Sequence, residues 1–117
     1  AALLFSFSAA AHEMTPAYPK FKLSYIDGVS VTKMSLFNRR NDASYYEIGV
    51  FTKDWEEVPF ASTQKVIKVR YTKRYPFEVY VRNGDLEKVV YICTISKILK
   101  GSEKTSQISS RICSKVK

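Results

Sequence analysis

The chain is poor in the residues on which most catalytic and metal-binding sites depend. It contains one histidine, His12, and two cysteines, Cys93 and Cys113, among 117 residues. A catalytic dyad or triad usually uses a histidine as its base, and a structural zinc site usually takes several His or Cys ligands. One histidine near the start of the chain argues against both. We therefore expect a protein that is not an enzyme and that carries no cofactor and no metal.

Glycines and paired acidic residues are also scarce. Four glycines are present, and none of them belongs to a glycine-rich phosphate-binding loop. The one directly adjacent acidic pair is Glu56 and Glu57. Neighbouring residues of a strand point to opposite faces, so these two carboxylates are poorly placed to act together on one substrate.

The sequence has no apolar run long enough for a membrane helix. Its most apolar stretch, residues 1–11, is too short to span a bilayer. It is similar to the apolar core of a secretory signal, and cleavage after Ala11 would leave His12 as the mature N-terminus. The alternative is an ordinary apolar first strand. We expect residues 1–11 to be a signal-peptide remnant and residues 12–117 to form one soluble domain in an oxidising compartment.

What the chain does contain is apolar surface and positive charge. Hydrophobic residues make up 45% of it, which is enough to build a core. The formal net charge is +8, from 19 basic and 11 acidic residues. Such an excess permits binding to nucleic acid, anionic lipid or an acidic partner and specifies none of them. The basic residues are spread along the chain, which is typical of a solvated face, so we expect no nucleic acid partner and keep a basic nucleic-acid binder as a distant alternative.

Short β-prone runs follow one another with turn signals between them. The expected strands cover residues 21–26, 30–37, 44–52, 65–71, 77–82, 89–98 and 106–117. Helical periodicity is not sustained for a dozen residues. The spacing predicts an all-β fold, a seven-stranded antiparallel immunoglobulin-like sandwich. A small closed barrel of the oligonucleotide-binding kind is the competing topology.

Two of these runs alternate cleanly. In residues 65–71 the inward positions are expected to be Ile67, Val69 and Tyr71. In residues 77–82 they are expected to be Phe77, Val79 and Val81. The Asn83-Gly84 dipeptide that follows predicts a hairpin-type turn.

The two cysteines lie symmetrically about a polar, turn-rich centre. A hairpin centred near Glu103 would place Cys93 opposite Cys113, close enough for a disulfide. The alternative is two unrelated buried thiols. The secretory character of residues 1–11 favours the bond, because disulfides persist in oxidising compartments.

Several motifs, taken in order, resemble the N-terminal domain of the periplasmic chaperones that assemble chaperone–usher pili. Asp27-Gly28 and the strand that ends at Asn38 resemble the first turn and the following strand of that family. Residues 43–51, 85–92 and 107–117 resemble its later strands. Leu86 stands where the family commonly has arginine, and Ile98-Leu99-Lys100 stands where Ile-Pro-Pro is usual. A cysteine pair joining the last two strands is found in some branches of the family.

The resemblance implies a periplasmic protein that lends its last strand to a pilus subunit lacking one, a process called donor-strand complementation. Its partners would be pilus or other secreted subunits and an outer-membrane usher. The residues implied for the subunit-binding strand are Ile108, Ser110, Ile112 and Val116. The basic residues implied for anchoring the subunit's terminal carboxylate are Lys22, Lys117 and, in an alternative register, Lys115.

Other interpretations stay open at this point. Ile108 and Ile112 could line the domain's own core, and any of the three lysines could be a plain surface charge. The family has a second sandwich domain after this one, so the sequence is expected to be either a truncated chaperone or a one-domain relative. The alternative function is a secreted structural or adhesion-type sandwich, a pilus or virion component without chaperone activity.

Overall fold

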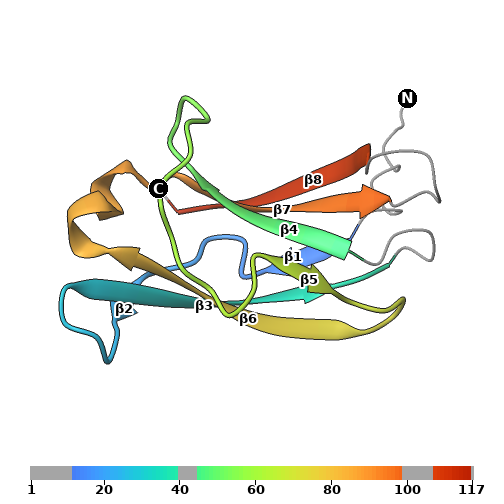
Figure 1. Ribbon diagram of the computed structural model, residues 1–117, viewed down its shortest axis with the longest axis horizontal. Coiled ribbons are helices and arrows are strands. Elements are labelled where there is room, and N and C mark those ends of the chain that lie inside the picture. The colour runs from blue at the N-terminus through green and yellow to red at the C-terminus, as the bar shows by residue number, and fades with distance from the viewer. Residues whose placement is uncertain (1–11, 40–44, 99–106, 117) are drawn as a thin grey trace, which may run out of the picture.

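The computed structural model of the chain describes residues 12–39, 45–98 and 107–116, and for residues 98 and 107–110 it describes the backbone alone. Strands dominate it, and they form two antiparallel sheets packed as a sandwich (Figure 1). The predicted fold class is therefore confirmed, with eight strands in the described residues rather than seven. The strands are β1 (Glu13–Thr15), β2 (Lys22–Leu23), β3 (Val29–Phe37), β4 (Tyr45–Phe51), β5 (Val66–Lys68), β6 (Arg74–Arg82), β7 (Tyr91–Ile98) and β8 (Gln107–Lys115).

One sheet is built around β3. Strand β6 pairs with β3 along its whole length, from Val29 opposite Arg82 to Phe37 opposite Arg74. On the other side of β3, β1 pairs with its end and β2 with its beginning. The strand β1 lies outside the strands expected from the sequence, in a segment, residues 12–19, that contains two prolines.

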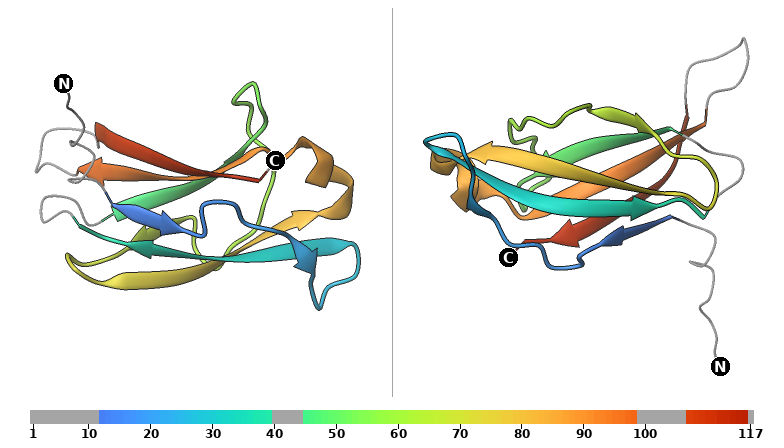
Figure 2. Two further views of the ribbon diagram at one scale, coloured as in Figure 1. Left: turned by 180° about the vertical axis from the view of Figure 1, so that it is seen from behind. Right: turned by 90° about the horizontal axis from the view of Figure 1, so that it is seen from below.

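In the described ranges the second sheet has the order β5-β4-β7-β8, so β8 is its edge strand. Figure 1 shows the two sheets as layers, with β7 and β8 in one and β3 and β6 in the other. In the view from behind in Figure 2, β1 lies at the side of the sandwich where β8 forms the edge, and residues of β1 and β8 are in contact.

The core fills the space between the layers with alternate residues of the long strands. The period of two places every second side chain on the inner face, and the buried positions of β4 and β6 follow this rule. The predicted inward residues Ile67, Val69, Phe77, Val79 and Val81 are all buried. The prediction for Tyr71 was wrong, because its side chain is 52% exposed. Strand β5 ends at Lys68, and the chain turns at residues 71–72.

The hairpin predicted at Asn83-Gly84 was also wrong. A 3-10 helix, η2 (Asn83–Lys88), stands there and carries the chain from β6 in one sheet to β7 in the other. The asparagine is used for anchoring: its backbone N–H donates to the carbonyl of Gly28 at 2.8 Å, and its side-chain oxygen accepts a bond from Ser30 at 2.6 Å. The partly buried side chain of Leu86 packs this connection against the core.

Candidate functional site: the outward border of β8

The predicted disulfide is present and joins β7 to β8. Cys93 and Cys113 are direct register partners, with a Cα–Cα distance of 4.0 Å and an S–S distance of 1.98 Å. The bond therefore fastens the edge strand to its neighbour. A disulfide of this kind is typical of proteins outside the reducing cytoplasm.

The alternation of hydrogen-bonded and non-hydrogen-bonded pairs between β7 and β8 shows which backbone groups of β8 face away from β7. The N–H of Val116 donates to the carbonyl of Val90 at 2.7 Å, so residue 116 points its backbone groups toward β7. In an antiparallel pair the direction alternates, and hydrogen-bonded pairs alternate with non-hydrogen-bonded pairs whose Cα atoms are closer. The backbone groups of Arg111, Cys113 and Lys115 therefore point outward. The short Cα–Cα distance of 4.0 Å at the disulfide agrees with this alternation.

One end of this outward border is already occupied by the chain itself. The N–H of Lys115 donates to the carbonyl of Ala17 at 3.0 Å, and the hydroxyl of Ser114 donates to the carbonyl of Pro16 at 2.7 Å. Within the described part of the chain, Lys115 is the one position of β8 whose outward backbone group makes such a bond. Among the described residues, the border is therefore closed at Lys115 and open at Arg111 and Cys113.

The residues that the resemblance assigned to the binding strand differ in their placement. A register shift lies between Ser96 and Lys97 of β7, so Ser110 is opposite Ser96 whereas Ile108 is opposite Lys97. The shift changes the simple alternation on which the predicted row was based; the side chains of Ile108 and Ser110 lie outside the described residues. The side chains of Ile112 and Val116 are partly buried and pack against this domain's own core.

The lysines implied as a carboxylate anchor are distributed over both sheets. Lys22 is an exposed residue of β2, opposite Val31 of β3. Lys115 is an exposed residue at the end of β8, opposite Tyr91. Lys117 lies outside the described residues. The lysine next to the open part of the border is therefore Lys115.

An aromatic cluster that the sequence did not predict covers the outer face of the same sheet. The rings of Trp55 and Tyr91 are stacked, with centroids 4.2 Å apart and an interplanar angle of 3°. The guanidinium carbon of Arg111 lies 4.5 Å from the centre of the Trp55 ring, within the range of a cation–π contact. Side chains of β7, β8 and the turn after β4 thus meet on this face, and Arg111 links the edge strand to the turn.

The cluster depends on one glycine and on one unusual backbone conformation. A Cβ added to Gly49 would come within 2.7 Å of the Phe51 ring, so that ring can lie over the strand where residue 49 has no side chain. Trp55 has a φ of 64°, which is uncommon for a non-glycine residue. The glycine in the middle of a predicted strand was the signal that could have indicated this close approach.

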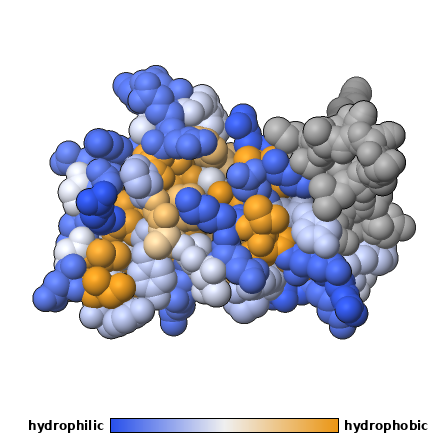
Figure 3. Space-filling model, in the orientation of Figure 1, coloured by the Kyte–Doolittle hydropathy of each residue, from blue (hydrophilic) through white to orange (hydrophobic). Residues whose placement is uncertain are grey.

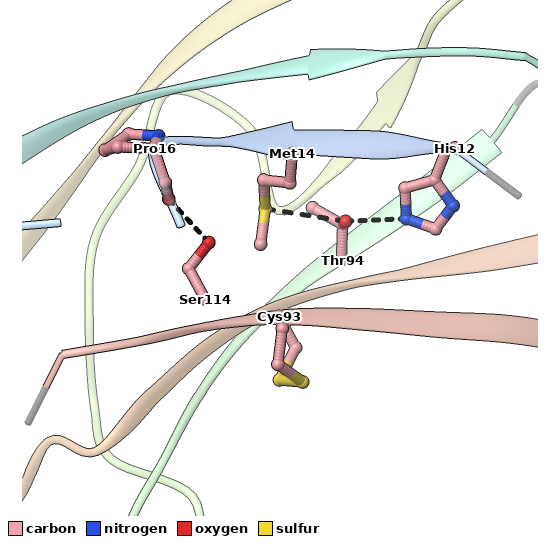
Figure 4. The surroundings of a disulfide bond; sticks show 7 residues. His12, Met14, Pro16, Cys93, Thr94 and Ser114 are labelled. Atoms are coloured by element: carbon pink, nitrogen blue, oxygen red, sulfur yellow. Dashed lines mark hydrogen bonds between the residues drawn. A yellow bond between two sulfur atoms is a disulfide. The ribbon is translucent and has the colours of Figure 1, made fainter. Parts of the chain in front are cut away.

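The first described residues hold the two sheets together beside β8 (Figure 4). His12 is buried, and its Nε2 lies 2.8 Å from the hydroxyl of Thr94 on β7. The same hydroxyl donates to the sulfur of Met14 at 3.6 Å. Sequence reasoning placed His12 at a chain terminus and missed this contact, because it joins residues 82 positions apart.

A hollow of about 360 Å³ lies between β4 and residues 57–65. Its apolar walls include Val58, Phe60 and Ile95, and its charged residues are Glu47, Glu57 and Lys65. Figure 3 views the side of the sandwich that carries β4 and β5 and shows hydrophobic residues gathered in its middle. The hollow is distinct from the border of β8, which lies beyond β7.

Searches for a metal site and for a membrane span among the described residues found neither. Histidine, cysteine, aspartate and glutamate side chains form no group of three or more there that could hold a metal ion. No helix in the described ranges is long and apolar enough to cross a membrane. Comparison of the chain with protein-family models, with curated proteins and with solved structures found no match.

Proposed function

We propose that this domain is a binding module that captures an extended segment of another secreted polypeptide along the outward border of β8. The observation that carries the proposal is the open border at Arg111 and Cys113 on an edge strand. Unpaired backbone groups at a sheet edge are a template for an added strand. The disulfide supports the proposal, because it holds the edge strand in place while its border is exposed.

The more specific form of the proposal is a periplasmic chaperone for pilus subunits. It rests on the resemblance of the motifs at residues 27–38, 43–51, 85–92 and 107–117 to that chaperone family. In this form the captured segment belongs to a subunit that lacks a strand, and the affinity comes mainly from main-chain hydrogen bonds. We propose no catalytic role, since the single histidine is buried against Thr94 rather than placed in a cleft.

One observation favours the second candidate, a secreted structural or adhesion-type sandwich. The side chains of Ile112 and Val116 pack against this domain's own core, as the last strand of a self-sufficient sandwich would. In that case the border of β8 would be an ordinary sheet edge.

A proline substitution at Arg111 distinguishes the two functions. The N–H of Arg111 points away from β7, so Arg111→Pro leaves the β7–β8 ladder intact, as prolines on edge strands do. It removes one outward donor and obstructs an added strand. The control Arg111→Ala keeps the donor and removes the same contact with Trp55.

The measurement is binding of a soluble peptide of about ten alternating Thr and Val residues, long enough to follow the border. We expect Arg111→Ala to bind the peptide within about threefold of the natural chain. We expect Arg111→Pro to bind it at least about tenfold more weakly, because the peptide loses one hydrogen bond and the proline ring obstructs its approach to β8. Equal binding by the two variants, or unfolding of Arg111→Pro alone, would refute the outward assignment. A pilus subunit lacking a strand, used as a second probe, tests the chaperone form.

A further inference from the structure

Residues 12–17, which we call the N-terminal strap, connect the two sheets at the side where β8 lies. At its first half the strap belongs to one sheet, because Glu13 to Thr15 pair with Phe37 to Ser35 of β3. At its second half it belongs to the other sheet, because Ala17 accepts a backbone hydrogen bond from Lys115 of β8.

The strap makes hydrogen bonds to both β7 and β8. Toward β7, the hydroxyl of Thr94 contacts both His12 and Met14. Toward β8, the contacts are those of Ser114 with Pro16 and of Lys115 with Ala17. Pro16 and Ala17 themselves are exposed. The second half of the strap, exposed at Pro16 and Ala17, is the kind of element that opens locally while the rest of the domain stays folded.

We propose that the strap is an internal competitor for the border of β8, and that its release extends the border from Cys113 to Lys115. This inference rests on the proposed function. While Ala17 accepts the hydrogen bond of Lys115, a captured strand can pair with the outward groups of Arg111 and Cys113 but not with the N–H of Lys115. When the strap opens, the outward N–H of Lys115 becomes available to the same strand.

The proposal predicts a penalty for partners that reach Lys115 and none for partners that end beside Cys113. A segment that ends beside Cys113 leaves the strap in place. A segment that also pairs with Lys115 must displace the strap, and its apparent affinity is reduced by the fraction of molecules in which the strap is open. The strap thus sets the length and register of the segment that binds most readily.

The test weakens the strap without changing β8's outward backbone. Thr94→Val keeps the shape of the side chain and removes the bonds to His12 and Met14, and Ser114→Ala removes the bond to Pro16. The first readout is amide hydrogen exchange in the protein without a partner. In the double variant we expect the amide of Lys115, which donates to the strap, to exchange at least about tenfold faster.

The amide of Val116 is the internal control, because it donates to Val90 of β7 rather than to the strap. We expect its exchange to stay the same within about twofold. Equal acceleration of both amides would mean that the strap opens only together with the strand, and would overturn the proposal. Should the double variant fail to fold, Ser114→Ala alone is measured, with an expected acceleration at Lys115 of about fivefold.

The second readout is binding of two alternating Thr-Val peptides, of about five and about ten residues. We expect the double variant to bind the longer peptide about tenfold more tightly than the natural chain does, and the shorter peptide equally well. Equal gains in affinity for both peptides, or no gain for either, would overturn the competition by the strap and leave the proposed function standing. If neither peptide binds either protein, the proposed function fails. The competition by the strap then fails with it, whatever the amide hydrogen exchange at Lys115 shows.

Discussion

Tyr80 on β6 donates a hydrogen bond from its phenol to the Glu78 carboxylate, at 2.6 Å. This bond is the largest cause that raises the pKa of Tyr80 to about 12, and partial burial and the negative charge of Glu78 add to it. The folded protein therefore holds this proton more tightly than the unfolded chain, in which a tyrosine has a pKa near 10. Stability from this group is complete below about pH 10 and is lost as the pH rises toward about 12.

The corresponding prediction is that Glu78→Gln lowers the pKa of Tyr80 toward about 10, because the charged acceptor is removed. An ultraviolet absorbance titration measures it. The chain has eight tyrosines, so the signal of Tyr80 is obtained as the difference from Tyr80→Phe. A Tyr80 titration that is the same with and without Glu78 would show that the hydrogen bond does not control it.

Single residues also show where sequence reasoning succeeded and where it failed. The inward positions Ile67, Phe77 and Val79 were predictable, because each lies in a run with strict alternation and its burial depends only on the period of a strand. The environment of His12 was not predictable, since its partner Thr94 is distant in sequence. The same holds for the contact of Arg111 with Trp55.

At the scale of elements, the hairpin β7–β8 was the most predictable part of the molecule. Its cysteines fix one register, and the observed pairing of Cys93 with Cys113 is the one expected from their symmetric placement. The register shift near Ser96 could not be predicted from the sequence, because no glycine or proline marks it. The connection at Asn83-Gly84 failed for a different reason: a local turn signal cannot tell whether the next strand lies in the same sheet.

The disulfide should contribute a large part of the domain's stability. It closes a loop with a sequence separation of 20 residues. In the chain-entropy model such a loop corresponds to about 3 kcal/mol. We expect the double variant Cys93→Ala, Cys113→Ala to lose about that amount in the free energy of unfolding, measured by urea denaturation.

The matched control for this loss is the natural chain under reducing conditions, which breaks the same bond without changing a side chain's size. The two measurements should agree within about 1 kcal/mol. A loss close to zero in both would mean that the backbone ladder with β7 and the packing of Ile112 and Val116 hold β8 on the sheet without the disulfide.

At the scale of the whole molecule, the sandwich was predictable from the spacing of the β-prone runs, and the position of its open border was not. An all-β chain of this size has several ways to order its strands, and the order β5-β4-β7-β8 found here places β8 at an edge. The two-sheet path of the strap, from β3 to β8, is also a property of the whole topology. The net charge of +8 makes molecules of the protein repel one another and does not define a partner.

The most direct measurement is amide hydrogen exchange of β8 with and without a saturating alternating Thr-Val peptide of about ten residues. The outward amides of Arg111 and Cys113 should become at least about tenfold more protected when the peptide is bound, because an added strand accepts their hydrogen bonds. The amide of Ile112, which points toward β7, should change little and serves as the reference. Protection that is equal at all three positions, or absent at Arg111 and Cys113, would contradict the account.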